Sequence, residues 1–384
     1  MKTVYLDNAA TTPIDPLVRK AMEPFVEKEY GNPSSIYSLG RDAKAAVENA
    51  RSIMAKFLGA ESSEIYFTSG GTESNNWALK GVAYANKEKG GHIITTAVEH
   101  SSVLQSARFL EEQGFKVTYI MPDKYGIISP ESVKKAITKN TFLISVMHAN
   151  NEIGTIEPIR EIGEIAQDHE ILFHTDAVQT VGHMQVDVNK LKVDLLSLSS
   201  HKFYGPKGAG VLYIRKGTKI SPILHGGGQE KRMRSGTENT ACIVGMGEAA
   251  VIAGNVMDYE NKRLTEMRDK FVEVFFNRIP HAVLNGHETK RLSNNINIMI
   301  PEIEGEAIVL RLDRLGIFAS TGSACSALEL GPSHVLQAVG RTKQEAHSSL
   351  RFTLGRYTEE KDLEYVLSTV IKIVDAFIKD DRCI

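Results

Sequence analysis

The stretch that decides the fold is Leu198-Ser199-Ser200-His201-Lys202, which closes an apolar run that begins at Val193. A shorter apolar run, Ile171 to Phe173, leads into His174-Thr175-Asp176-Ala177-Val178-Gln179. Short runs that are apolar throughout are typical of buried strands. The sequence therefore predicts two strands, one ending near Asp176 and the other near Lys202.

An aspartate and a lysine at two strand ends fit a site for pyridoxal phosphate (PLP). Lys202 would carry the Schiff base, and Asp176 would keep the ring nitrogen protonated so that the ring acts as an electron sink. The same two residues also fit a surface lysine beside an ordinary N-cap aspartate. On this pair alone both interpretations stay open.

The bulk properties indicate a soluble globular protein. A chain of 384 residues is long enough for two cores, so we expect a large and a small domain. The net charge of -2 argues against nucleic acid or an anionic membrane as the main partner. No uninterrupted apolar stretch reaches the roughly 18 residues of a membrane span, and the N-terminus lacks a signal-peptide core. We expect a cytoplasmic protein with neither nucleic acid nor membrane as a partner.

The three cysteines, Cys242, Cys325 and Cys383, form no disulfide framework and no zinc-like spacing with histidine. We therefore expect no metal site built by the fold. Cys325 lies in a run of small residues, 319–327, that cannot bury a thiol, which favours a nucleophile. Cys242 stands among apolar neighbours and is predicted to be a small buried residue, and Cys383 to be incidental.

Strand-like and helical patterns alternate from about residue 40 to residue 215, which predicts an α/β fold with a mainly parallel sheet covered on both faces. We predict a large domain over residues 15–258, and a small α+β domain over residues 1–14 and 259–384 that carries Cys325. The seven strands expected in the large domain are 65–68, 92–96, 116–120, 142–147, 171–173, 193–198 and 210–214. The small domain is predicted to hold a broken helix over 237–278, helices at 306–315 and 359–378, and strands at 294–300 and 350–353.

Several polar residues stand at the predicted strand ends, where ligands collect in parallel sheets. Ser69-Gly70-Gly71-Thr72 joins a strand to a helix. Small residues let backbone N–H groups approach an anion, the helix start favours negative charge, and Thr72 adds a hydroxyl. A Gly-Gly turn alone is more often only a turn, but this context suits a cofactor phosphate.

Four further residues have both a plain and a functional interpretation. His100 is either a helix-start histidine or an imidazole on the cofactor ring that assists proton transfer. Gln179 is placed to bond the ring hydroxyl, and Asn151 is either a substrate or ring contact or an Asx-turn residue. Arg351 is either a surface ion-pair partner or the group that captures a substrate carboxylate.

Together these residues resemble the cysteine desulfurases, in the class V branch of the PLP enzymes of fold type I. The resemblance covers nearly the whole chain, and its motifs occur in the family's order. The runs that carry it are Tyr5 to Thr12, Gly31 to Ser35, Ser69 to Asn75, Asn150 to Gly154, Ser199 to Lys202, Gly226 to Glu230 and Met233 to Thr237.

The resemblance implies a role for each matching position. Lys202 and Asp176 look like the Schiff-base lysine and the ring-nitrogen partner, and Cys325 like the nucleophile that forms a persulfide. The other cofactor contacts implied are Gly71, Thr72, His100, Asn151, Gln179, Ser199, His201 and Thr237. Thr237 would reach the phosphate of the other subunit, which implies a homodimer with shared active sites. Asn151 and Arg351 look like substrate contacts.

The implied reaction converts L-cysteine to L-alanine and leaves the sulfur on Cys325. The sulfur would pass to an iron–sulfur scaffold protein or another acceptor, for cluster assembly or thiolation, with the Cys325 persulfide against a nascent cluster. Lys202 would move the substrate proton, with His100 as a helper. The alternatives are a selenocysteine lyase, another class V aminotransferase, or a non-catalytic assembly subunit. Cys325 argues against a plain aminotransferase, and the presence of both Lys202 and Cys325 argues against a non-catalytic subunit.

Overall fold

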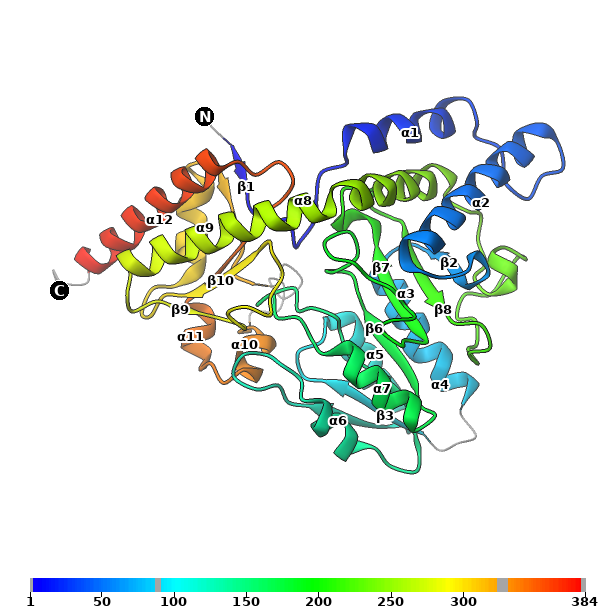
Figure 1. The fold of residues 1–384 in the computed structure, drawn as a ribbon, viewed down its shortest axis with the longest axis horizontal. Helices are drawn as coiled ribbons and strands as arrows, with labels where there is room; N and C mark the ends of the chain where they lie inside the picture. Colours follow the sequence, from blue (N-terminus) through cyan, green and yellow to red (C-terminus); the bar gives the residue numbers. More distant parts are fainter. Residues whose placement is uncertain (1–2, 87–90, 323–330, 381–384) are drawn as a thin grey trace.

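A seven-stranded sheet forms the centre of the computed structural model, which describes residues 3–86, 91–322 and 331–380 (Figure 1). Only the second strand in the sheet runs antiparallel to its neighbours; the others share one direction. The predicted mainly parallel sheet is therefore confirmed. Its spatial order is β2 (Ile65–Thr68), β8 (Gly210–Ile214), β7 (Leu195–Ser199), β6 (Leu172–Asp176), β5 (Thr141–Ser145), β3 (His92–Thr96) and β4 (Lys116–Ile120).

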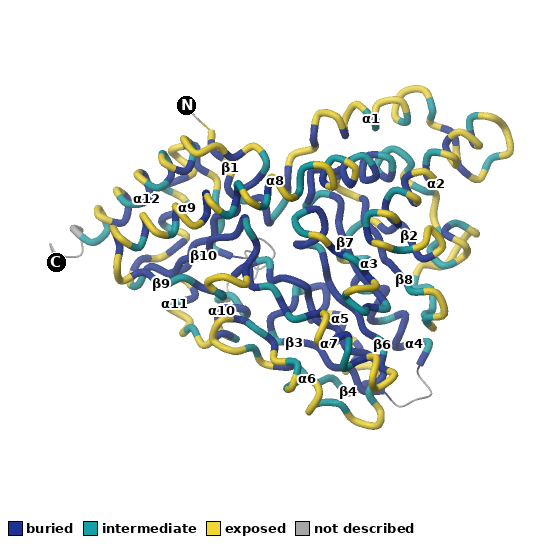
Figure 2. The backbone as a smooth tube through the Cα atoms, viewed as in Figure 1, coloured by how far each residue is buried: buried dark blue, intermediate teal, exposed yellow. Residues whose placement is uncertain are grey.

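Helices cover both faces of this sheet, as its continuously apolar strands require. One face is packed by α3 (Gly71–Asn76), a π-helical turn (Trp77–Gly81), α4 (Val82–Ala85) and α5 (Ser101–Glu112). The other is packed by α2 (Ser38–Leu58), α6 (Pro130–Ala136), α7 (Ile159–Asp168) and the first half of α8 (Thr240–Arg278). Figure 2 shows the buried strands between these layers. The chain also contains α1 (Pro16–Glu27), and short 3-10 turns at Ser62–Glu64, Ser200–Lys202 and Glu230–Arg232.

A second hydrophobic core lies under the C-terminal half of α8. Its three-stranded antiparallel sheet has the order β12 (Ser349–Thr353), β10 (Asn295–Met299) and β9 (Val283–Leu284). The N-terminal strand β1 (Val4–Tyr5) pairs in parallel with β11 (Ile317–Phe318), so the start of the chain joins this part. The helices here are α9 (Gly305–Asp313), α10 (His334–Ala338), α11 (Lys343–His347) and α12 (Glu360–Asp380).

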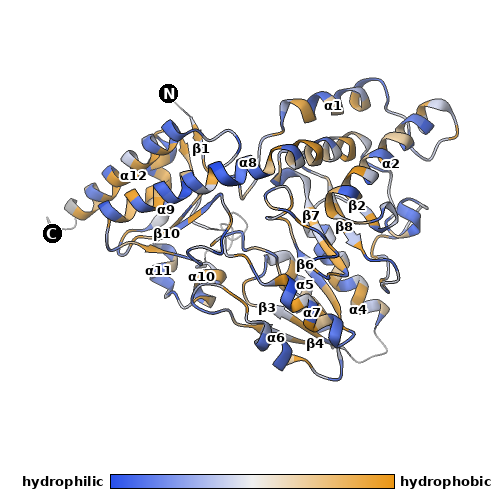
Figure 3. Cartoon of the chain, in the orientation of Figure 1, coloured by the Kyte–Doolittle hydropathy of each residue, from blue (hydrophilic) through white to orange (hydrophobic). Residues whose placement is uncertain are grey.

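The long helix α8 connects the two cores (Figure 1). By length and composition it is also the one helix, in the described part of the chain, that could cross a membrane. The sequence shows no uninterrupted apolar run here because Glu248 interrupts it. Met246 and Ala250 pack into the first core, while Leu264 and Phe271 pack into the second. Figure 3 shows that the half of α8 against the large core is mostly apolar, whereas its C-terminal half carries many polar residues.

The predicted division of the chain at residue 258 falls inside α8 and stays a prediction. The two cores correspond broadly to the two predicted domains. However, α10 lies in the range predicted for the small domain, yet its Val335 and Leu336 belong to the hydrophobic core of the large sheet, together with Met147 and Ile153. Helix α10 is therefore packed against the large core.

Candidate active site

A cavity of about 210 Å³ opens where the carboxyl ends of β6 and β7 face the starts of α3 and α5. Parallel sheets commonly bind ligands at this edge. Nearly all the predicted site residues line this one cavity: Gly71, Thr72, His100, Asn151, Asp176, Gln179, Ser199, His201, Lys202 and Arg351. Ala9, Ala10, Asn75 and Ser102 line it as well.

The amine of Lys202 lies in this cavity, so the alternative of a surface lysine is wrong. Lys202 ends the 3-10 turn that follows β7. Its Nζ donates hydrogen bonds to the carbonyl oxygens of Ala9 (2.6 Å) and Ala10 (2.8 Å). The N-terminal segment thus places the amine beside the other polar groups of the cavity.

Asp176 is the last residue of β6 and is buried. Its Oδ1 accepts a hydrogen bond from the backbone N–H of Val178 (2.9 Å), and its Oδ2 accepts one from Nδ2 of Asn75 (2.6 Å). Each carboxylate oxygen has two lone pairs, so acceptor capacity remains for a donor in the cavity. This is the arrangement that a protonated ring nitrogen needs.

His100 both caps a helix and lines the cavity, so the two interpretations of this residue are compatible. As the N-cap of α5, its Nδ1 accepts a hydrogen bond from the backbone N–H of Ser102 (3.1 Å). Burial lowers the pKa of His100, the charge of Asp176 opposes that shift, and the charges of Lys202 and His334 lower the pKa further. The ring is therefore a neutral imidazole near neutral pH.

The Gly70-Gly71-Thr72 turn forms a close-fitting cradle at the start of α3. Gly70 has φ of 150°, a conformation that favours glycine. A Cβ on Gly71 would lie 2.7 Å from Cγ2 of Val178, so only glycine keeps this floor open. Ser199 and His201 face the same cavity, and burial together with Lys202 and Lys207 lowers the pKa of His201 to about 4. Neutral donors and a helix start suit a phosphate.

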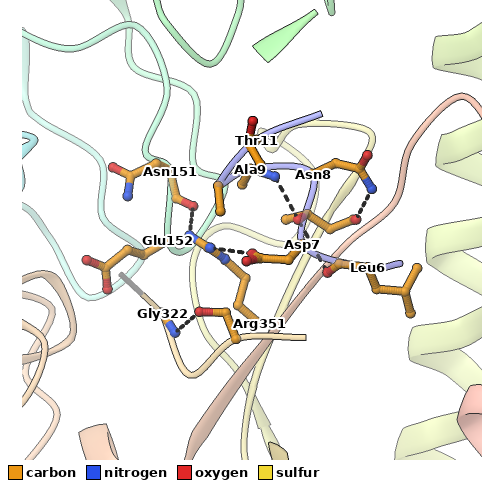
Figure 4. Close-up of polar contacts among 12 residues, drawn as sticks. Leu6, Asp7, Asn8, Ala9, Thr11, Asn151, Glu152, Gly322 and Arg351 are labelled. Carbon is orange, nitrogen blue, oxygen red and sulfur yellow. Dashed lines mark hydrogen bonds and ion pairs between the residues drawn. The ribbon is translucent and has the colours of Figure 1, made fainter. Parts of the chain in front are cut away.

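Arg351 is buried beside the cavity rather than exposed at the surface (Figure 4). Its Nη1 donates to the backbone oxygen of Asn151 (2.8 Å), and its Nη2 pairs with Oδ1 of Asp7 (2.8 Å). Its Nε is buried and bonds to none of the described residues. An arginine that is 2% exposed, and still has a donor to offer, fits a carboxylate ligand.

Two predicted residues are not placed in this cavity. Cys325 lies outside the described residues. On the described flanks, a Cβ on Gly322 would lie 3.0 Å from Oε2 of Glu152, and Oγ of Ser333, two residues after the described chain resumes at Gly331, donates to the same oxygen (2.5 Å). Both flanks therefore meet Glu152, next to Asn151 at the cavity. Figure 4 shows Gly322 beside Glu152 and close to Arg351.

Thr237 lines a separate small cavity with Ser69, Glu230 and Arg234. Arg234 pairs with Glu73 of α3 (2.8 Å), so this segment lies against the outer side of the cradle. The predicted role of Thr237 toward a partner subunit stays a prediction.

The residues that sequence reasoning missed are Asp7, Ala9, Ala10, Asn75 and Ser102. Asn75 and Ser102 had a weak signal, since each follows a predicted site residue by two or three positions on a helix. Asp7, Ala9 and Ala10 lie in the Tyr5 to Thr12 run that carries the resemblance, but no local pattern assigned them to the site, because the N-terminal segment reaches it through distant contacts such as the pairing of β1 with β11.

The donor set of the cavity fits PLP. The cavity offers an amine, a buried carboxylate, two neutral imidazoles and a glycine cradle, which match the aldehyde, ring nitrogen and phosphate of the cofactor. The buried arginine, whose Nε has no partner among the described residues, matches the carboxylate of an amino acid. Within residues 3–86, 91–322 and 331–380, no cluster of three His, Cys, Asp or Glu side chains could hold a metal ion.

Comparisons with known proteins agree with this geometry. The family model described as aminotransferase class-V matches residues 4–366. The cysteine desulfurase IscS of Dictyoglomus turgidum is 56% identical over 97% of this chain and 95% of that protein. A solved structure titled NifS-like protein has a TM-score of 0.92 at 39% identity, over 97% of this chain and 100% of that one.

A structure titled SspA in complex with cysteine has a TM-score of 0.82 at 39% identity, over 93% of this chain and 100% of that one. The family model covers well over half of this chain, and the relatives match it almost end to end. The chain therefore belongs to the class-V aminotransferase family and, within it, to the cysteine desulfurases, which use PLP.

Proposed function

We propose that this protein converts L-cysteine to L-alanine and retains the sulfur as a persulfide on Cys325. The observation that carries the proposal is the cavity that joins the Lys202 amine, the Asp176 carboxylate, the His100 imidazole and the buried Arg351. A relative of the same fold has been solved with cysteine bound, which supports the choice of substrate.

Each residue of the cavity has a definite task. When bound, PLP supplies an electron sink for the electron pair left by the Cα proton of the substrate. Asp176 accepts the ring N–H, and Gly71 and Thr72 offer donors to the phosphate. Arg351, fixed by Asp7, offers its Nε–H to the substrate carboxylate. The Lys202 amine, held at the mouth of the site by Ala9 and Ala10, moves the Cα proton.

Sulfur transfer needs a thiolate that attacks the substrate sulfur. A bond forms between Sγ of Cys325 and the substrate sulfur, the substrate Cβ–S bond breaks, and its electron pair returns to the carbon skeleton. After Cβ gains a proton, L-cysteine and the enzyme thiol have become L-alanine and an enzyme persulfide, so atoms and electrons balance. His100, a neutral imidazole over the site, is the second group that can carry a proton.

We further propose a homodimer in which Thr237 completes the phosphate site of the partner subunit. The support is its place on a segment that lies against α3 but outside the cavity of its own chain. The persulfide sulfur would pass to an iron–sulfur scaffold protein or another acceptor in the cytoplasm. Gel filtration with light scattering tests the dimer, and a monomer that retains full activity would contradict it.

The function is tested by measuring alanine and sulfide together, from L-cysteine and a thiol reductant. Wild type is expected to give the two products in equal amounts. Cys325→Ser should lose both by more than about 100-fold, because the step is covalent, while Cys242→Ser serves as the matched control and keeps them. Full sulfide release by Cys325→Ser would refute the nucleophile, and a keto acid in place of alanine would indicate an aminotransferase.

A further inference from the structure

We propose that Asn75 is a positioning residue: its two amide hydrogens tie the Asp176 carboxylate to the Ser102 hydroxyl, and through Ser102 they orient the His100 imidazole. The inference rests on the proposed function, in which Asp176 accepts the ring N–H of the cofactor and His100 can carry a proton. It adds a single side chain that holds both residues in place.

Asn75 is 1% exposed and lies on α3, which packs against α5. Its Nδ2 lies 2.6 Å from Oδ2 of Asp176 and 2.8 Å from Oγ of Ser102. An amide nitrogen carries two hydrogens, so each acceptor receives one. Asn75 thus bridges the end of strand β6 and the first turn of α5.

The orientation of the Asn75 amide is fixed by its neighbours. In the flipped orientation its oxygen would face the Asp176 carboxylate, acceptor against acceptor. In the observed orientation Oδ1 is buried and bonds to none of the described residues. Burying an oxygen without a hydrogen-bond donor destabilises the folded protein. An apolar side chain of similar size would fill this space without burying an unsatisfied oxygen. The amide is explained by its two donated hydrogen bonds toward the site.

Ser102 passes the constraint on to His100. Because the Ser102 hydroxyl oxygen accepts from Asn75, its own hydrogen is directed to Nδ1 of His100, 2.8 Å away. The backbone N–H of Ser102 donates to the same nitrogen. Nδ1 has one lone pair, which the two hydrogens share, so the ring hydrogen lies on Nε2 and the Ser102 hydroxyl adds to the orientation that the backbone N–H sets.

The same bridge restrains the carboxylate. Asn75 and the Val178 N–H each hold one oxygen of Asp176, so the plane of the carboxylate is fixed before any ligand binds. Outer partners of this kind typically change the affinity of a site about 10- to 100-fold when removed. Asn75 is therefore expected to control both the affinity for PLP and the state of His100.

The test compares Asn75→Leu, which keeps the volume and removes both donors, with Ser74→Ala as a matched control. Ser74 is the preceding residue on α3 and is equally buried, but its hydroxyl bonds to Thr68 and Val211 outside the cavity. Two quantities are measured: the dissociation constant for PLP binding to the apoenzyme, and the ¹⁵N chemical shifts of the His100 ring in the apoenzyme. His100→Gln identifies the His100 signals.

Asn75→Leu is expected to weaken PLP binding about 10- to 100-fold and to move the ¹⁵N shift of His100 Nδ1, because the Ser102 hydroxyl is then free to turn away from that nitrogen, whereas Ser74→Ala changes neither. If PLP binds more weakly but the His100 shifts are unchanged, Asn75 does not link Asp176 to His100. The proposal is also overturned if neither the PLP dissociation constant nor the His100 shifts change. If Asn75→Leu does not fold, Ser102→Ala decides: the His100 shifts are expected to move, and unchanged shifts would overturn the proposal. The apoenzyme shifts do not depend on turnover, so they separate this inference from the proposed desulfurase function.

Discussion

At the scale of single residues, the buried guanidinium of Arg351 is the group that we propose for binding the substrate carboxylate. Asp7 and the Asn151 backbone hold two of its nitrogens and leave Nε for a ligand. The planar guanidinium is therefore oriented before the substrate arrives. Such preorganisation lowers the cost of binding a carboxylate.

Replacing Arg351 with lysine is expected to raise the KM for L-cysteine about 10- to 100-fold and to change kcat less. A lysine ammonium has its three hydrogens on one atom, so it cannot reproduce the separate, coplanar donors that meet Asp7, Asn151 and a carboxylate. Steady-state kinetics measures the change. The control is Arg160→Lys, at an exposed position on α7 paired only with Glu164. An unchanged KM would show that another group binds the carboxylate.

The sequence predicted those site residues that sit in local patterns. Lys202, Asp176 and Gly71 each stand at a strand end or a glycine turn, and the cavity brings them together. Asp7 and Asn75 carry no such pattern, because their roles depend on contacts with Arg351 and Asp176, far away in the chain. A single sequence does not reveal which distant polar groups will meet.

At the scale of elements, a buried ion pair fixes the segment that leads to Thr237. Arg51 on α2 and Glu230 make two hydrogen bonds (2.7 and 2.8 Å), with side chains 4% and 3% exposed. Glu230 also accepts from the backbone N–H of Phe67 on β2. Residues 230–232 all have positive φ, which is strained for residues other than glycine. The ion pair holds this strained turn on the edge of the sheet.

Glu230→Ala is expected to destabilise the protein by about 3–5 kcal/mol, because the buried Arg51 guanidinium loses its buried carboxylate partner and keeps at Nε the half-exposed Glu48. Chemical denaturation followed by circular dichroism measures the loss. Glu23→Ala is the control, since Glu23 pairs with Arg19 on the exposed face of α1 at 3.8 Å and should cost under about 1 kcal/mol. Equal losses in the two variants would mean that the buried pair does not stabilise the turn.

Element prediction succeeded where the pattern was long and local. All seven strands of the central sheet were predicted, since each is a short apolar run between helical patterns. The helix predicted with breaks over residues 237–278 is one continuous helix, α8. The breaks were predicted because polar residues interrupt its apolar pattern, and the helix continues because its two halves pack into different cores. The two-residue strands β1, β9 and β11 were not predicted, since only their tertiary partners define them.

At the scale of the whole molecule, the active site lies between the two cores. Lys202 and Asp176 come from the large sheet, whereas Arg351 comes from β12 of the second core, and the N-terminal segment joins them. Conditions that loosen the packing of either core should therefore act on the site as well. Acid is one such condition, because histidines are buried inside the large core.

Burial lowers the pKa of His148 to about 4 and that of His174 to about 3, from an ordinary 6.5. The unfolded chain takes up protons at the ordinary value while the folded chain does not. The contribution of the two neutral histidines to the free energy of unfolding is thus fully present above pH 6.5 and is lost as the pH falls toward about 4. For His148 alone the loss reaches up to about 3 kcal/mol.

His148→Gln should therefore flatten the fall of the thermal midpoint between pH 6.5 and about 4, while retaining a partner for Thr180. The measurement is a series of thermal melts across this range. His281→Gln, at an exposed position, is the control and should follow the wild-type curve. If His148→Gln falls as steeply as wild type, then His148 does not contribute to acid sensitivity.

The most direct test of the central claim is the mass of the peptide that carries Cys325 after one turnover with L-cysteine and no reductant. We predict that this peptide gains one sulfur atom, that the Cys242 peptide gains none, and that Lys202→Ala abolishes the gain. Alanine formed without added sulfur on Cys325, or sulfur found on Cys242 instead, would contradict the account.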